Sequence, residues 1–411
     1  MAVRLLLVGV GHAHLEILLR LARRPPGGPE IELTVVSPGE LHHYSGMVPG
    51  FLSGIYREEE IAVRLRDLVL RAGRTTESRL VLGRAVGFEP GSRVVAVESS
   101  PPAAPLPTAS ASHREAGSDD REGESERSKG TAPERLSYDL VSFAVGSDSA
   151  GAAAFQGVES IQPIKPIGRA AELRRRIGQL AGSPREEAVV VVGGGAGGVE
   201  IALAVAGRFA AAGARHRISL VEAGPRILTG YGDRFVRRAE QALRRRGVAV
   251  HASGRVAAVD ENQDALRLED GTLIPSRLTV WVTGAIGWPL FRGCGLPLDR
   301  RGFLLVDQAL RSLADPRVFA AGDCGTLAAF PETPKAGVYA VREGPVLWRS
   351  LRAALAGSEP PPRYRPQRGF LSILNTGDGR ALLRWGALVS HGRWAMRFKD
   401  RIDRRFLARY Q

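Results

Sequence analysis

The chain has 411 residues and a mass of 44.1 kDa, enough for two or three domains with hydrophobic cores of their own. Its only cysteines, Cys294 and Cys324, exclude a disulfide framework, a cysteine-based zinc finger and an iron–sulfur cluster, so we expect a reducing cytoplasmic environment and no metal site. The formal net charge is +14, but the 57 basic residues include only four lysines and no recognition motif accompanies them, so no nucleic-acid partner is expected.

Near the N-terminus an apolar run, Leu5–Val8, leads directly into a glycine turn. No polar spacer or small-residue cleavage site follows, so we interpret the run as a buried parallel strand and not as a signal peptide. The turn carries Gly9 and Gly11, and His14 takes the third position of the dinucleotide-binding pattern G-x-G-x-x-G. A second strand at Ile31–Val36 indicates a βαβ unit. Alone, the incomplete pattern is a weak indication, because a G-x-G pair is equally common in packing turns.

Residues 99–135 form a low-complexity segment with no valine, isoleucine, methionine or aromatic residue and only one leucine. Such a segment cannot bury enough apolar surface to offset the entropy of ordering, so we expect a disordered insertion. The insertion is predicted to interrupt a hairpin between strands at Val94–Glu98 and Leu140–Val145. A docking tail is the alternative interpretation.

A second glycine loop, 184 residues after the first, has the complete pattern. Gly193, Gly195 and Gly198 follow an apolar strand and precede an apolar helix. In this arrangement backbone N–H groups and the helix N-terminus bind a pyrophosphate. Glu222 ends the next strand, where a carboxylate accepts hydrogen bonds from both ribose hydroxyls and repels a 2′-phosphate. We therefore expect NADH to be preferred over NADPH, although Arg226 nearby weakens this preference.

The chain resembles the flavoproteins with two dinucleotide-binding domains, the pyridine nucleotide-disulfide oxidoreductase superfamily, and within it the branch of type II NADH:quinone dehydrogenases and sulfide:quinone oxidoreductases. Besides both glycine loops, the resemblance rests on the segments Tyr138–Ser147, Leu278–Ala285 and Val318–Cys324, and it covers nearly the whole chain. It implies an α/β fold with two Rossmann-like three-layer domains, bound to FAD and NADH. The implied organisation is an NAD domain at 155–284 inserted into an FAD domain at 1–154 and 285–345, followed by a small α+β C-terminal region at 346–411.

The resemblance also implies roles for individual residues. Asp323 matches the aspartate that binds the ribityl chain of FAD, and Lys335 precedes a helix whose N-terminus faces the flavin pyrimidine ring. Glu200 matches a glutamate near the nicotinamide and the flavin N5, where it would hold the carboxamide or relay a proton. We take Glu200 and Lys335 as catalytic candidates, with solvated side chains as the alternative for both. Besides the residues of the glycine loops, the predicted cofactor ligands are Ser45, Gly46, Pro49, Gly146, Gly284, Gly322 and Ala336.

Residues 44–50 are similar to the Tyr-Ser-Gly-Met-Leu-Pro-Gly signature of a subgroup that is sometimes fused to selenophosphate synthetase. This similarity leaves a selenium- or sulfur-handling oxidoreductase as one alternative function, and a non-enzymatic FAD-binding module is another. A disulfide reductase needs two thiols beside the flavin, as C-x-x-C or C-x4-C, and the chain has neither pattern. We therefore expect hydride transfer from NADH to FAD, followed by electron transfer to a quinone or a similar non-thiol acceptor.

The C-terminal segment 392–411 is predicted to form a basic amphipathic helix, preceded by a hairpin at 370–385. Its apolar stripe at i, i+4 spacing consists of Trp394, Phe398, Ile402, Phe406 and Tyr410. As in type II dehydrogenases, such a helix would lie on an anionic membrane surface, at the inner face of the cytoplasmic membrane. The alternative is that the helix packs on the protein's own core or on the second subunit of a homodimer.

Overall fold

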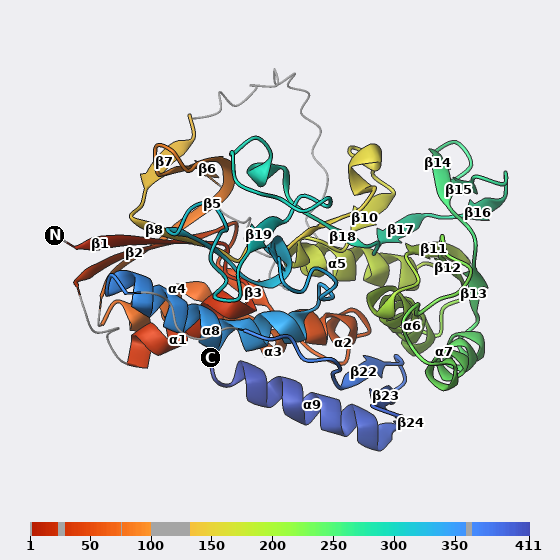
Figure 1. The fold of residues 1–411 in the computed structure, drawn as a ribbon. Helices are drawn as coiled ribbons and strands as arrows, with labels where there is room; N and C mark the ends of the chain where they lie inside the picture. Colours follow the sequence, from red (N-terminus) through yellow and green to blue (C-terminus); the bar gives the residue numbers. More distant parts are fainter. Residues whose placement is uncertain (1, 24–28, 75, 100–131, 359–363) are drawn as a thin grey trace, which may run out of the picture.

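The computed structural model describes residues 2–23, 29–74, 76–99, 132–358 and 364–411 (Figure 1). Within these ranges the chain forms two mainly parallel sheets covered by helices, and a smaller C-terminal region packs against both (Figure 1). Residues 100–131 of the low-complexity segment lie outside the described residues, so their disorder stays a prediction. At the two ends of the segment the prediction is wrong, because Ser99 ends one strand and Glu134 and Arg135 begin another. The expected α/β fold with Rossmann-like sheets is confirmed.

The first sheet has seven strands in the order β20-β8-β1-β2-β5-β6-β7. The strands are β1 (Val3–Val8), β2 (Ile31–Ser37), β5 (Glu77–Glu89), β6 (Val94–Ser99), β7 (Glu134–Ser137), β8 (Leu140–Phe143) and β20 (Val318–Ala320). β20, β8, β1, β2 and the start of β5 are parallel. Helices α1 (His12–Arg23), α4 (Leu65–Ala72) and α8 (Gly337–Leu355) lie together beneath this sheet (Figure 1). Leu5–Val8 is continuously apolar because a parallel strand covered on both faces has no solvent-facing side.

The predicted partner of Val94–Glu98 is wrong. β6 pairs antiparallel with β7, so that Val94 lies opposite Ser137. β8 instead lies inside the parallel sheet, between β1 and β20, with all four residues buried. The reason is hydrophobic burial: β8 is apolar enough for a central position, whereas three of the four residues of β7 are exposed, as suits an edge strand.

The second sheet has five parallel strands in the order β10-β17-β11-β12-β13. The elements of this unit are β10 (Ile161–Pro163), α5 (Ala170–Ala181), β11 (Glu187–Val192), α6 (Ala196–Ala211), β12 (His216–Val221), α7 (Asp233–Arg245), β13 (Val248–His251), the antiparallel strands β14 (Val256–Asp260), β15 (Ala265–Leu268) and β16 (Leu273–Pro275), and β17 (Leu278–Trp281). The two segments through which the chain enters and leaves this unit lie side by side, because β9 (Asp148–Ser149) pairs with β18 (Ala285–Ile286).

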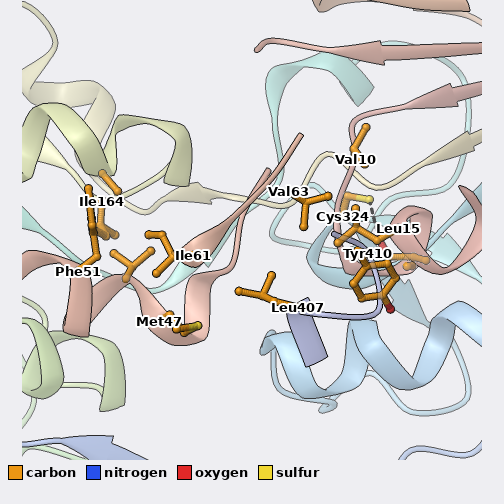
Figure 2. Packing of buried hydrophobic residues seen from close by; sticks show 14 of the residues in the cluster. Val10, Leu15, Met47, Phe51, Ile61, Val63, Ile164, Cys324, Leu407 and Tyr410 are labelled. Carbon is orange, nitrogen blue, oxygen red and sulfur yellow. Dashed lines mark hydrogen bonds between the residues drawn. The ribbon is translucent and has the colours of Figure 1, made fainter. Parts of the chain in front are cut away.

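Shorter elements complete the surroundings of the first sheet. They are β3 (Leu41–His43), η1 (Ser45–Met47), α2 (Val48–Leu52), α3 (Glu58–Ile61), β4 (Ala62–Arg64), η2 (Ala152–Phe155), η3 (Ile167–Arg169), η4 (Pro289–Phe291), β19 (Leu304–Val306), η5 (Gly322–Cys324) and β21 (Gly325–Leu327). Residues of η1 and α2 join α1 and the C-terminal residues in one buried cluster, part of which Figure 2 shows around Met47, Leu15 and Tyr410.

The C-terminal region contains the predicted hairpin with one further strand, followed by the predicted helix. Its elements are β22 (Ser372–Asn375), β23 (Ala381–Trp385), β24 (Leu388–Gly392) and α9 (Arg393–Leu407), which lies along the lower edge of the molecule (Figure 1). The turn after β22 meets α6 backbone to backbone: a Cβ atom on Gly207 would lie 2.3 Å from the carbonyl oxygen of Gly377. Only glycine permits this approach.

The five residues of the predicted apolar stripe do not lie on one buried face of α9. Trp394, Phe398 and Ile402 are exposed, whereas Phe406 is half-buried and Tyr410 is buried. The buried face consists of Ala395, Met396, Lys399, Asp403 and Leu407. The helix therefore packs on the protein's own core through one face, as the alternative interpretation proposed, and presents a second apolar row to solvent. The buried face can include the charged residues Lys399 and Asp403 because they form an ion pair at i, i+4 spacing.

Candidate functional site

Three loops from neighbouring strands converge at one edge of the first sheet. The first glycine loop follows β1, Gly146 follows β8, and Gly322 follows β20. Because these strands are parallel and adjacent, their carboxyl ends lie together, which is where open α/β sheets bind ligands. Gly9 has a φ of +75°, and a Cβ atom there would lie 2.8 Å from the Ala144 carbonyl oxygen, so this loop requires glycine.

His14, which replaces the third glycine of the first loop, lies beneath that loop. It is fully buried, with Nδ1 2.6 Å from the Gly9 carbonyl oxygen and Nε2 2.9 Å from the Ser142 hydroxyl. Burial lowers its pKa to about 4, so the ring is neutral at physiological pH. His14 thus links the first glycine loop, through Gly9, to β8, through Ser142.

Asp323 is held by two side chains that the sequence analysis did not single out. Its Oδ2 accepts hydrogen bonds from the Ser147 hydroxyl at 2.7 Å and from the Lys165 ammonium at 3.1 Å. Burial alone would raise the pKa of Asp323, but Lys165, Ser147 and Lys335 outweigh it and the pKa is lowered. Asp323 is therefore ionised, and it lies at the carboxyl edge of the sheet. A carboxylate in this position can accept hydrogen bonds from the hydroxyl groups of a ligand.

Lys335 points back into the protein. Its ammonium donates to the Gly325 carbonyl oxygen and, at 2.9 Å, to the Thr326 hydroxyl, and it lies 4.3 Å from the centre of the Phe303 ring. Ala336 is the N-cap of α8. A cavity beside these residues is also lined by Asp323 and Glu343. Lys335 is therefore a fixed cation near Asp323, and the alternative of a freely solvated lysine does not describe it.

The second glycine loop has the same position at the edge of the second sheet. A Cβ atom on Gly198 would lie 1.7 Å from the Gly193 carbonyl oxygen, whereas one on Gly195 or Gly284 would meet nothing within 4 Å. The third glycine therefore permits close packing of helix on strand, and the second leaves the loop open to a ligand. Gly284 lies beyond the end of β17, which pairs with β11, and so borders the same edge.

The acidic side chain expected at a ribose lies beside this loop. Glu222 accepts hydrogen bonds at 2.6 Å from the N–H groups of Gly194 and Gly224. Arg226, which weakened the expected preference for NADH, is bound elsewhere: its guanidinium donates to Asp233 and to the Tyr231 carbonyl oxygen, each at 2.9 Å.

Glu200 is buried on the first turns of α6, so the alternative of a solvated glutamate is wrong. Its Oε1 accepts a hydrogen bond of 2.7 Å from the Asn375 N–H of the C-terminal region. Burial raises its pKa to about 7, although Lys399 and the Asn375 N–H act in the opposite direction. A carboxyl group with this pKa can hold or release a proton at neutral pH.

The segment that carries Ser45, Gly46 and Pro49 lies next to the first glycine loop. Ser45 and Gly46 form η1, and Pro49 is buried in α2. A Cβ atom on Gly46 would lie 2.9 Å from the Tyr44 ring, so glycine is needed for that ring to fold over the backbone. A Cβ atom on Gly337, at the start of α8, would lie 3.6 Å from the Ser45 hydroxyl, which brings η1 to the N-terminus of that helix.

These residues fit FAD on structural grounds. The N-termini of α1 and α8, the ionised Asp323 and the η1 segment surround one region at the sheet edge. The Nε2 atoms of His12 and His42 are buried there with no partner among the described residues, which is costly unless a bound group supplies one. No group of three metal-ligating side chains occurs in the described ranges.

Neither cysteine is placed for thiol chemistry. Cys324 is fully buried, and its Sγ lies 3.3 Å from the carbonyl oxygens of Phe143 and Ala321. Burial raises its pKa to about 12, so it has no thiolate character at physiological pH. Cys294 is only partly buried but packs against the hydrophobic core.

Two glycine loops, each at the carboxyl edge of its own parallel sheet, define a protein with two dinucleotide-binding units. Sequence comparison agrees with this class and makes it specific. Residues 3–344 match the pyridine nucleotide-disulphide oxidoreductase family, and the chain belongs to that family.

Several relatives are named as NADH:quinone oxidoreductases. The chain is 30% identical over 251 residues to the type II NADH:quinone oxidoreductase Ndh of Mycobacterium tuberculosis, covering 55% of this chain and 54% of Ndh. It is 23% identical to NdhA of the same organism, over 95% of this chain and 79% of NdhA. For Ndh and other curated relatives, the chain spans about half of their length or less.

Solved structures share the fold. The sulfide:quinone oxidoreductase of Aquifex aeolicus superposes with a TM-score of 0.73 at 16% identity, covering 100% of this chain and 91% of that one. NDH2 of Plasmodium falciparum in complex with NADH superposes with a TM-score of 0.70 at 13% identity, covering 100% of this chain and 98% of that one.

Proposed function

We propose that this protein oxidises NADH with a bound FAD and passes the electrons to a quinone or a similar acceptor. The observation that carries the proposal is the pair of glycine loops at the edges of two packed sheets, in a chain whose two cysteines are unsuited to disulfide chemistry. The names of the type II relatives support the acceptor class.

Each unit would contribute its own binding groups. FAD, when bound, supplies a two-electron carrier, which side chains alone cannot provide. The first glycine loop would bind its pyrophosphate, and Asp323, oriented by Ser147 and Lys165, would accept from the ribityl hydroxyls. The second loop would bind the NADH pyrophosphate, and Glu222 the adenosine ribose. Glu200, buried and with a pKa near neutrality, would orient the nicotinamide carboxamide or hold a proton.

The experiment is an anaerobic titration of the purified protein followed by visible absorption. We expect a flavin spectrum that NADH bleaches at lower concentration than NADPH does, and that a soluble quinone restores. A bound flavin that neither nucleotide bleaches would contradict the proposal. Bleaching without recovery on addition of quinone would contradict only the acceptor.

We further propose that the protein binds an anionic membrane surface through α9. Within the described ranges, no helix is long and apolar enough to span a membrane. An exposed apolar row nevertheless lies beside an exposed arginine row, the pattern of a helix that lies in the interface. The apolar side chains of this row are Trp394, Phe398 and Ile402, and the arginines are Arg393, Arg397, Arg401 and Arg405. Trp385 and Leu388 are also exposed, on the strands β23 and β24 that precede the helix.

Deletion of 392–411 would not test this proposal cleanly, because it also removes Lys399 and Asp403 from the core. A variant with serine at 394, 398 and 402 changes only exposed side chains, and Leu70→Ser is a matched control because that leucine is 65% exposed on another helix. We expect the triple variant, but not the control, to lose sedimentation with anionic liposomes. The proposal would be contradicted if the wild-type protein does not bind liposomes. If the wild-type protein is also a dimer and the triple variant is a monomer, a second subunit covers this apolar row.

A selenium- or sulfur-handling oxidoreductase is the second candidate, favoured by the signature at 44–50. The buried, protonated thiol of Cys324 argues against a persulfide mechanism at that residue. Reduction of the flavin by selenide or sulfide, but not by NADH, would favour this candidate.

A further inference from the structure

One buried carboxyl group beside the proposed FAD site has no role in the proposed reaction. Glu343 lies about two turns into α8 and is 6% exposed. It lines the same cavity as Asp323 and Lys335. Burial is costly for a charged carboxyl group, and a buried titratable group that faces a cavity is a candidate for a functional role.

Glu343 holds the start of η5 in place. Its Oε2 accepts a hydrogen bond of 2.5 Å from the N–H of Gly322, the residue before Asp323. Gly322 has a φ of +73°, and a Cβ atom there would lie 3.3 Å from the Cβ atom of Ala340, which precedes Glu343 by about one turn of α8. Helix and loop are therefore closely packed, and Glu343 links them at the residue that precedes the proposed ribityl ligand.

The other oxygen of Glu343 is free to carry a proton. Oε1 has no hydrogen-bond partner in the part of the chain that the structure describes, so Oε2 can accept from the Gly322 N–H in either protonation state. Burial raises the pKa of Glu343 to about 7, although the Gly322 N–H and Lys335 lower it. The neutral carboxyl group is therefore the main form below pH 7, and the carboxylate is the main form above it.

The surroundings of Glu343 offer its carboxylate little compensation. The titratable and charged groups that face it are Asp323 and Cys324 on η5, Lys335 before α8, Tyr339 on its own helix, and Tyr364. An ionised Glu343 would add a second negative charge beside the ionised Asp323. The ammonium of Lys335 donates to a backbone carbonyl oxygen and a threonine hydroxyl, and not to Glu343.

We propose that Glu343 is a positioning residue for FAD and that the protein retains FAD more tightly when this carboxyl group is neutral. The inference rests on the proposed function and adds a pH-dependent control of cofactor retention at the same site. Glu343 would lose its remaining contact with water when FAD, held by Asp323, covers the cavity. This loss costs more for the charged form than for the neutral form, so binding favours the neutral form. Retention of FAD is therefore complete below pH 7 and weakens as pH rises through 7.

The test measures the release of FAD from the full-length holoprotein, by dilution at pH 6 and at pH 8.5 and detection of free FAD by fluorescence. We expect the dissociation constant of the wild-type protein to rise at least about threefold between these values, which requires FAD binding to raise the pKa of Glu343 further by only about half a unit. Glu343→Gln keeps an acceptor oxygen but cannot ionise, so its constant should change by less than about twofold. Glu332→Gln, a matched control at an exposed position, should behave as wild type.

A second variant tests the positioning role. Glu343→Leu leaves the Gly322 N–H without its acceptor and should weaken FAD binding about tenfold at both pH values, whereas Glu343→Gln should bind FAD as tightly as wild type does at pH 6. The infrared band of a protonated carboxyl group should be stronger in wild type than in Glu343→Gln at pH 6, and this difference should decrease at pH 8.5. The infrared readout and the glutamine variant do not depend on whether the leucine variant folds.

The inference would be overturned if FAD release from wild type is independent of pH, if the pH dependence persists in Glu343→Gln, or if Glu343→Leu retains FAD as wild type does. Equal loss of FAD from the glutamine and leucine variants would also overturn it, because the acceptor oxygen would then have no effect. Failure of the proposed function is distinguishable: a bound flavin that NADH does not bleach contradicts that function, and its release can still be measured. A purified protein without flavin would overturn both.

Discussion

Replacing Glu200 by glutamine should change how the stability of the protein depends on pH. Burial raises the pKa of this carboxyl from 4.5 to about 7, so the folded protein keeps a proton that the unfolded chain has lost in this interval. The stability contributed by the neutral carboxyl is complete below pH 4.5 and declines as pH rises through about 7. The difference of roughly 2.5 pKa units corresponds to about 3 kcal/mol. Glutamine is always neutral, so Glu200→Gln should lose none of this stability.

The assay is urea unfolding followed by tryptophan fluorescence at pH 5 and pH 8. We expect the variant to gain about 2.5 kcal/mol relative to wild type between these two values, because part of the effect is already lost at pH 5, while Glu332→Gln, an exposed control, gains nothing. The comparison has to be relative to wild type, because burial also raises the pKa of Glu343 to about 7 and that group titrates in both proteins. An equal stability difference at both pH values would refute the reasoning.

Three other substitutions probe the loops. Asp323→Ala removes the acceptor between Ser147 and Lys165 and should weaken FAD binding about 10- to 100-fold, measured as flavin retained per protein; a fully loaded variant would contradict the ribityl role. Glu222→Ala should reduce the preference for NADH over NADPH about tenfold in flavin-reduction titrations while FAD stays bound, and unchanged discrimination would remove Glu222 from the site. Gly198→Ala places a Cβ atom 1.7 Å from a carbonyl oxygen and should lower the free energy of unfolding by about 3 kcal/mol or more; a variant as stable as wild type would show that the loop adapts.

Much of the fold was predictable because it depends on local patterns. Continuous apolar strands, glycine turns and periodic helices are visible in any window of the sequence, and β1, α1, β11 and α6 all lie where these patterns indicated. The partner of β6 was not predictable in the same way. Two candidate strands lie at the end of the low-complexity segment or within ten residues after it, and only burial in the complete sheet decides that β8 is central and β7 peripheral.

The candidate site was predictable where a motif carries it and missed where distant residues meet. Lys165 and Asp403 have no motif of their own, and their contacts join residues 158 and 359 positions apart. One signal was available: in a chain whose basic residues are nearly all arginine, three of the four lysines, at 165, 335 and 399, are hydrogen-bonded to buried groups. A rare residue type in such a chain marks positions where a compact ammonium suits the space and a guanidinium does not.

The backbone contact between Gly207 and Gly377 has a consequence for motion within the molecule. The paired strands β9 and β18 are the only two crossings between the sheets in the described ranges, and alone they would act as a hinge. The C-terminal region ties α6 down through that glycine pair, with no side chain between the two backbones to absorb a rotation. In the proposed reaction, this contact would oppose any rotation that changes the separation of the two nucleotide loops.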